Sequence, residues 1–95
     1  MSDPETTIVI PADPNDPEDF DVTEAAMQRA LKGRRIRMAR NAAQLTQAEF
    51  AERFRIPVGT LRDWEQSRAT PPDFAMVYIA LIERDPDLVA ELAAA

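Results

Sequence analysis

Beyond residue 20, apolar residues recur along the chain at the spacing of a helix. In the segment 34–43, Ile36, Ala39 and Ala43 fall on one stripe at intervals of three and four residues. Apart from TTIVI, at residues 6–10, no segment alternates as a half-buried strand would. The pattern therefore predicts an all-α body of five or six short helices.

Capping residues and prolines mark where these helices begin. Asp21 and Glu24 fit a capping box, which predicts a first helix over about 22–32. Gly33 either ends this helix or only loosens it before the next one, at 34–43. Four more helices are expected, each beginning at a capping residue or a proline: 46–54, 57–66, 73–83 and 86–94.

The first 20 residues differ in composition from the rest of the chain. They contain six acidic residues, four prolines and no basic residue, and Ile8, Val9 and Ile10 form a lone apolar triplet. Such a segment has too little apolar surface to fold alone. We therefore expect a disordered acidic arm over 1–20, with a possible binding strand at 6–10, and a helical domain over 21–95.

Charge is distributed unevenly along the chain. The formal net charge is −6, but residues 1–24 carry −8, residues 29–68 carry +6 and residues 69–95 carry −4. The total alone would argue against binding to nucleic acid. The basic middle argues for it, because a local basic surface is what attracts phosphates.

Composition also excludes several kinds of chemistry. The chain has no cysteine and no histidine, which excludes disulfides, Cys/His zinc sites and acid–base catalysis by histidine. With only two glycines to build a phosphate loop, an enzyme is hard to sustain, and we expect no catalytic residue, metal or cofactor. The longest apolar run, at 74–82, is about half of a membrane span, and the N-terminus is acidic where a secretory signal is basic. A soluble cytoplasmic protein is expected.

The segment TQAEFAERFRIPVGTLRDWEQ (46–66) reads as two helices joined by a tight turn. Large apolar side chains recur one turn apart on each helix and once in the turn, and they would form one small core. These residues are Phe50, Phe54, Ile56, Leu61 and Trp64. Ala51 is small enough to let the helices cross closely, and Pro57 disfavours helical backbone at the preceding residue. The arrangement is that of a helix-turn-helix unit, the alternative being an amphipathic pair within another helical bundle.

A series of spaced positions over 34–72 carries a family resemblance. The positions are Arg40, Leu45-Thr46-Gln47, Ala51, Thr60-Leu61, Trp64-Glu65 and Pro71-Pro72. In their identity and spacing they resemble the XRE (Cro/C1-type) helix-turn-helix family. The chain departs from that family at Arg55 and Ser67, where glycine usually takes a left-handed backbone. The resemblance implies a DNA-binding domain in which Arg40 and Glu65 form a buried ion pair.

The second helix of this unit would present its outer side to the major groove of DNA. By helical spacing that side holds Val58, Gly59, Arg62 and Asp63. Arg62 is the candidate for a bidentate contact with guanine, the alternatives being a phosphate contact or a solvated charge. Val58 would pack on a thymine methyl group, Gly59 permits close approach, and Asp63 can accept from a cytosine amino group or only orient Arg62.

The resemblance implies further that Gln47, Thr60 and Arg68 hold phosphates of the DNA backbone. Gln47 stands at the start of the first helix of the unit, where free amides and the helix dipole favour an anion. The basic run at 32–37 either reaches flanking phosphates or the adjacent minor groove, or forms the solvated face of a helix.

A dimer is expected, because one such unit reads few base pairs and two-fold dimers bind two half-sites. The run 74–82 and the ending with Leu88, Val89 and Leu92 contain more apolar residues than a small domain needs for its core. The last helix is therefore the expected dimer surface, the alternative being ordinary core packing.

The segments IPVGTLRDWEQ and IERDPDLV also resemble antitoxins of the HigA/MqsA type, which repress their own operon and neutralise a co-expressed toxin. An acidic arm suits a small basic toxin, and the strand of Ile8, Val9 and Ile10 would add to the edge of a toxin sheet. One alternative is a stand-alone phage- or plasmid-type repressor, with the arm as a solubilising tail. Another is an adaptor that binds no DNA, against which the basic middle argues. Either DNA-binding reading implies a bacterial cytoplasmic protein, located on the nucleoid when bound to its operator.

Overall fold

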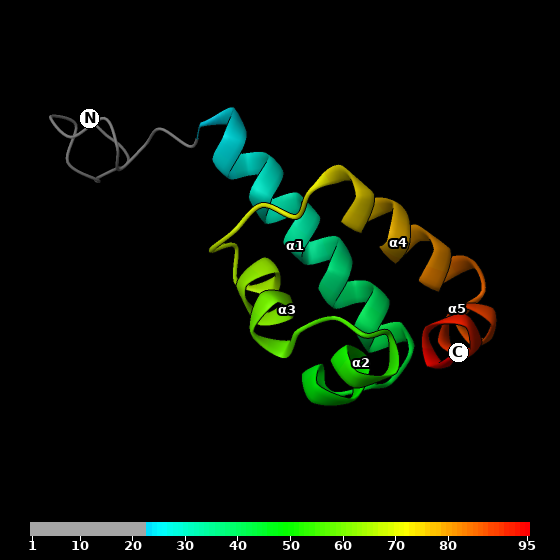
Figure 1. Ribbon diagram of the computed structural model, residues 1–95. Helices are drawn as coiled ribbons and strands as arrows, with labels where there is room; N and C mark the ends of the chain where they lie inside the picture. The colour runs from blue at the N-terminus through cyan, green and yellow to red at the C-terminus, as the bar shows by residue number, and fades with distance from the viewer. Residues whose placement is uncertain (1–22) are drawn as a thin grey trace, which may run out of the picture.

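Five helices and no strand make up residues 23–95, which are the residues that the computed structural model describes (Figure 1). The helices are α1 (Glu24–Ala42), α2 (Gln47–Arg53), α3 (Val58–Glu65), α4 (Asp73–Arg84) and α5 (Pro86–Ala94). The predicted all-α fold is confirmed, and α2 to α5 lie within about two residues of the ranges predicted for them. The strand predicted at 6–10 lies outside the described residues.

The first helix is longer than predicted. It runs without a break from Glu24 to Ala42. The sequence predicted helices over 22–32 and 34–43, which Gly33 would either separate or only loosen. Its N-cap is Thr23, whose hydroxyl accepts a hydrogen bond of 3.0 Å from the Ala26 backbone N–H. Thr23 therefore takes the capping role that was predicted for Asp21.

Gly33 is buried inside α1, where this helix crosses the end of α3. A Cβ atom at this position would lie well inside 3.0 Å of the Trp64 backbone oxygen. The glycine is thus required by the close approach of two helices, and it neither ends nor visibly interrupts α1.

The predicted capping motifs form at the starts of α2 and α5, whereas α3 and α4 follow Pro57 and Pro72 without a side-chain cap. At α2, the Thr46 hydroxyl accepts from the Glu49 backbone N–H at 3.1 Å, and the Glu49 carboxylate accepts from the Thr46 backbone N–H at 2.9 Å. At α5, the Asp85 carboxylate accepts from the Leu88 backbone N–H at 3.2 Å. Each cap satisfies amides that a helix start leaves without an intrahelical partner.

Three helices end in the same way, with a left-handed residue that is not glycine. Gln44, Arg55 and Ser67 have φ values of 60°, 59° and 61°. After α2, the Ile56 N–H donates to the Ala51 oxygen at 2.9 Å, and after α3 the Arg68 N–H donates to the Asp63 oxygen at 2.8 Å. This is the Schellman arrangement, which terminates a helix and turns the chain sharply. Each left-handed residue costs about 1 kcal/mol relative to glycine. The departures from glycine at Arg55 and Ser67 leave the turns intact, because both residues adopt the left-handed backbone at this small cost.

The core lies where α2 and α3 pack on each other and on α1, α4 and α5. Its largest fully buried apolar side chains are Ile36, Phe50, Phe54, Leu61 and Ile79. The rings of Phe50 and Phe54 are 4.8 Å apart between centroids, tilted by 57°. Burial of each such side chain stabilises the fold by roughly 1.5–3 kcal/mol. On α1 the buried stripe contains Ile36 and Ala39, but the predicted third member, Ala43, is exposed.

Candidate nucleic-acid interface

The outer face of α3 is the exposed side of the predicted helix-turn-helix unit. Leu61 and Glu65 are buried against α1 and α2, whereas Gly59, Arg62 and Gln66 are exposed on the opposite side. Asp63 is half-buried on this outer face. A helix anchored along one side and open along the other has the form required to enter a major groove.

Val58 and Gln66 differ from the sequence prediction. Val58 is half-buried and packs against the core, because its position on α3 lies beside Leu61 and Glu65, so its side chain is only partly free to face DNA. Gln66 was not predicted, although it follows Arg62 by four residues and Gly59 by seven. That spacing places it on the same face, and its exposed amide has the donor and acceptor pair that reads adenine.

A buried ion pair joins α1 to α3. The Arg40 Nε and Nη2 atoms donate to the two carboxylate oxygens of Glu65 at 2.8 and 3.0 Å, and Arg40 Nη1 donates to the Leu45 oxygen at 3.0 Å. The exposed fraction is 2% for the Glu65 side chain and 17% for that of Arg40. The hydrogen bond to Glu65 raises the pKa of Arg40 above its ordinary value. A bidentate pair of this kind fixes the rotation of α3 about its own axis.

Gln47 belongs to the same hydrogen-bonded group. Its side-chain Nε2 donates to the Glu65 carboxylate at 3.0 Å, which links the start of α2 to the end of α3. One N–H of the Gln47 side-chain amide is therefore used within the protein. Its predicted role as a phosphate contact, which would use the second N–H, stays a prediction.

Two further arginines of α1 bind the C-terminal end of α3. Arg37 Nη1 donates to the Glu65 backbone oxygen, and Arg29 Nε donates to the Ser67 oxygen at 3.1 Å. Helix C-termini expose carbonyls and carry partial negative charge, which these guanidinium groups offset. Arg37 was predicted to reach DNA or to lie on a solvated face, and it is half-buried, with Nη1 bound to the end of α3.

The rest of the basic run is only partly free. Arg35 Nη2 lies 2.8 Å from the Glu83 carboxylate on α4, and the hydrogen bond raises the pKa of Arg35. Lys32 Nζ lies 4.0 Å from the Asp73 carboxylate. Arg34 is exposed. Both pairs join α1 to α4 at the surface and contribute little to stability, so the predicted contact of this run with DNA stays a prediction.

Two charged side chains at the end of α3, those of Asp63 and Arg68, are in contact with solvent. Arg68 Nη1 lies 3.9 Å from the Asp63 carboxylate, with side chains 71% and 49% exposed. Exposed pairs of this kind contribute little to stability, so each group can take another partner at small cost. Of the predicted DNA-binding residues of α3 and the following loop, Gly59, Arg62 and Arg68 are exposed, and Val58, Thr60 and Asp63 are half-buried.

The predicted dimer residues separate into two environments. Val89 is 7% exposed and belongs to the core, because α5 packs this side chain against the body. It is therefore not available to a second copy. Leu88 and Leu92 are 48% and 66% exposed. The predicted partner-binding residues Ile8, Val9 and Ile10 lie outside the described residues.

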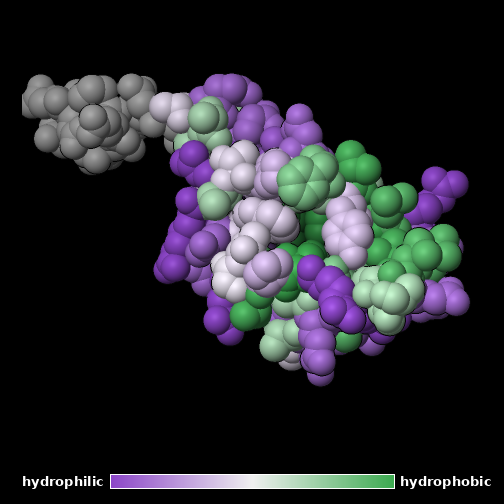
Figure 2. Space-filling view, viewed as in Figure 1, coloured by the Kyte–Doolittle hydropathy of each residue, from purple (hydrophilic) through white to green (hydrophobic). Residues whose placement is uncertain are grey.

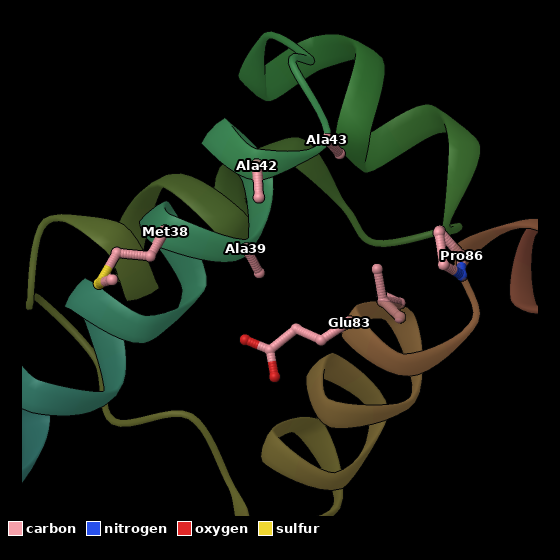
Figure 3. Close-up of a pocket in the computed structure, with 7 residues that line it drawn as sticks. Met38, Ala39, Ala42, Ala43, Glu83 and Pro86 are labelled. Atoms are coloured by element: carbon pink, nitrogen blue, oxygen red, sulfur yellow. The ribbon is translucent and has the colours of Figure 1, made fainter.

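An apolar groove of about 360 Å³ lies between α1 and the end of α4 (Figure 3). Met38, Ala42 and Pro86 line it, and Glu83 reaches into it from α4. Glu83 is the ionisable group of this lining, and its carboxylate is the one bound by Arg35. Over residues 23–95 no cluster of side chains suited to a metal ion is found, and no helix there is long and apolar enough to span a membrane.

Comparison with protein families gives one match. A family model described as a helix-turn-helix domain covers residues 33–92, from the middle of α1 into α5. The match begins at Gly33, the residue that permits the contact between α1 and α3. Neither a curated protein nor a solved structure matches the chain.

Proposed function

The chain belongs to the helix-turn-helix domain family and is a DNA-binding regulator, and we propose that it recognises a specific operator through the outer face of α3. The observation that carries this proposal is the contrast between the two sides of that helix. One side is locked by Leu61 and the Arg40–Glu65 pair, and the other presents Arg62 and Gln66 to solvent. Because the helix is held before DNA arrives, little ordering cost accompanies binding.

The chemistry of the exposed side chains suggests what each would read. Arg62 would donate two hydrogen bonds to guanine, and Gln66 would pair with adenine. Asp63 would accept from a cytosine amino group, and Gly59, with nothing within 4 Å of its Cβ position, lets the helix approach the bases closely. Thr60 and Arg68 would contact phosphates, which position the protein without reading sequence.

A homodimer would supply the second half-site. One eight-residue recognition helix reaches few base pairs, and two copies related by a two-fold axis would present two such helices about 34 Å apart. Leu88 and Leu92 would contribute to the dimer surface, since both are exposed apolar side chains on α5.

The regulator would be the antitoxin of a toxin–antitoxin pair that represses its own operon. Charge supports this, because residues 1–24 carry −8 and would complement a small basic toxin whose substrate is RNA. The triplet Ile8-Val9-Ile10 would add as a strand to an edge of the toxin sheet, with main-chain hydrogen bonds giving affinity.

Deletion of residues 1–20 should abolish neutralisation of the toxin and leave operator affinity equal or higher. The reason is that the deletion removes six acidic residues and the proposed binding strand, but no part of α3. The measurement is growth of cells that express the product of the neighbouring gene together with each variant, alongside a DNA-binding titration.

A matched pair of charge variants separates the strand from the charge of the arm. Val9→Asp should mimic the deletion, whereas Ala12→Asp adds the same charge outside the triplet and should still protect cells. A deleted chain that protects cells would move toxin binding to the helical body. A neighbouring gene without effect on growth would instead favour a stand-alone repressor.

A further inference from the structure

A second open groove lies between the α2–α3 turn and α4, with a volume of about 310 Å³. Three aromatic side chains line it, Trp64, Phe74 and Tyr78, together with Arg55, Ile56, Pro57, Thr60 and Ala75. Phe74 is 75% exposed, an unusual state for so large an apolar side chain. Figure 2 shows apolar side chains gathered over α4 on the face drawn in Figure 1.

One wall of this groove is fixed in place. The Tyr78 hydroxyl donates to the Phe54 backbone oxygen at 2.7 Å, and its partial burial raises the pKa of Tyr78 above its ordinary value. Trp64 is half-buried and packs against the core. The aromatic surface is therefore preformed, which lowers the cost of binding an extended ligand.

The chain itself contains a segment with the matching chemistry. Pro11, Pro14 and Pro17 recur every third residue, which is the period of a polyproline II helix. In that conformation the three rings would lie along one edge. Proline-rich segments of this spacing bind aromatic-lined grooves because their extended form is already favoured. Asp13 and Asp16 stand between the prolines and complement the charge of Arg55, which is exposed at the groove.

The segment can reach the groove within one chain. Arg29, in the N-terminal half of α1, is hydrogen-bonded to Ser67 just beyond α3, so the start of α1 lies near the end of the helix that carries Trp64. Pro17 precedes Thr23 by six residues, which span up to about 20 Å when extended. Gly33, which lies against the Trp64 backbone oxygen, follows Thr23 by ten residues, a rise of about 15 Å along α1.

We propose that this groove binds residues 11–17 of the same chain through the three prolines. This binding goes beyond the proposed function and does not depend on a toxin, since it leaves Ile8-Val9-Ile10 for a partner. It also places Asp13 and Asp16 beside α3. The negative charges of the bound segment then repel the DNA phosphates and lower the affinity for DNA. A partner that binds the arm and removes it from the groove restores that affinity.

Trp64 is the only tryptophan and lines the groove, so its fluorescence reports occupancy in the full-length protein. Replacing Pro11, Pro14 and Pro17 together with alanine keeps every charge. We expect this triple variant to show red-shifted Trp64 emission and stronger quenching by acrylamide than the parent. The matched control is Pro4→Ala, outside the repeat, which should leave both quantities unchanged.

A groove variant completes the test. In a Phe74→Ala background the triple proline replacement should have no further effect on quenching, because the groove has already lost its aromatic wall. Equal quenching of the parent and the triple variant would overturn the proposal. So would a proline effect that grows with protein concentration, since that result places the arm in a second copy rather than in its own chain.

Discussion

Replacing Glu65 with glutamine should lower the free energy of unfolding by about 3 kcal/mol or more, because it leaves a largely buried guanidinium without its counter-charge. Both carboxylate oxygens of Glu65 accept from Arg40, and one also accepts from Gln47. Glutamine has nearly the same shape but only one oxygen. In either orientation its amide would therefore point a donor at another donor. The variant keeps the volume of the side chain but removes its negative charge.

Urea unfolding followed by circular dichroism measures this effect. The control is Glu83→Gln, which breaks the more exposed pair with Arg35 and should change stability by less than about 1 kcal/mol. If Glu65→Gln unfolds at the same urea concentration as the parent, the Arg40–Glu65 pair does not hold α1 to α3.

Gly33→Ala should destabilise the domain by about 1–3 kcal/mol, although alanine is the better helix former. The added Cβ would meet the Trp64 backbone oxygen, and backbone cannot move aside as the tip of a side chain can. The two helices would have to separate. Arg29 and Arg37 would then lose their contacts with the carbonyls at the end of α3.

The second glycine provides a control with the opposite sign. Gly59 lies in α3 with nothing within 4 Å of its Cβ position, so Gly59→Ala should stabilise the domain by up to about 1 kcal/mol. Thermal unfolding of both variants checks the pair of predictions. A Gly33→Ala protein as stable as Gly59→Ala would show that α1 and α3 do not approach closely.

The boundaries of α2 to α5 could be predicted because their causes are local. Thr46 and Glu49 cap α2 through atoms three residues apart, and Asp85 caps α5 in the same way. The left-handed turns at Arg55 and Ser67 also followed from position in a family pattern, since the backbone there is set by the Schellman ending rather than by the residue. Caps and turns of this kind can be predicted from the sequence, because the residues that form them are close neighbours in the chain.

Features that depend on distant contacts could not be predicted. Whether Gly33 ends or only loosens the first helix could not be decided, because its partner, Trp64, lies far along the sequence. Arg37 was expected at DNA or in solvent, because its partner is a backbone carbonyl, which leaves no mark in the sequence. Val58 and Val89 sit at the margins of apolar stripes, where the neighbouring helices decide which residues are covered.

Replacing Arg62 tests whether α3 reads DNA sequence. A preferred duplex is first selected from a random pool, and affinities of the parent and Arg62→Ala are then measured on it, on its single-base variants and on unrelated DNA at one salt concentration. If α3 reads sequence, Arg62→Ala should lose about 1–3 kcal/mol on the preferred duplex and lose its preference at one base pair of each half-site. Arg68→Ala should instead weaken binding to all duplexes alike. Equal losses for Arg62→Ala on preferred and unrelated DNA would show that Arg62 does not read a base.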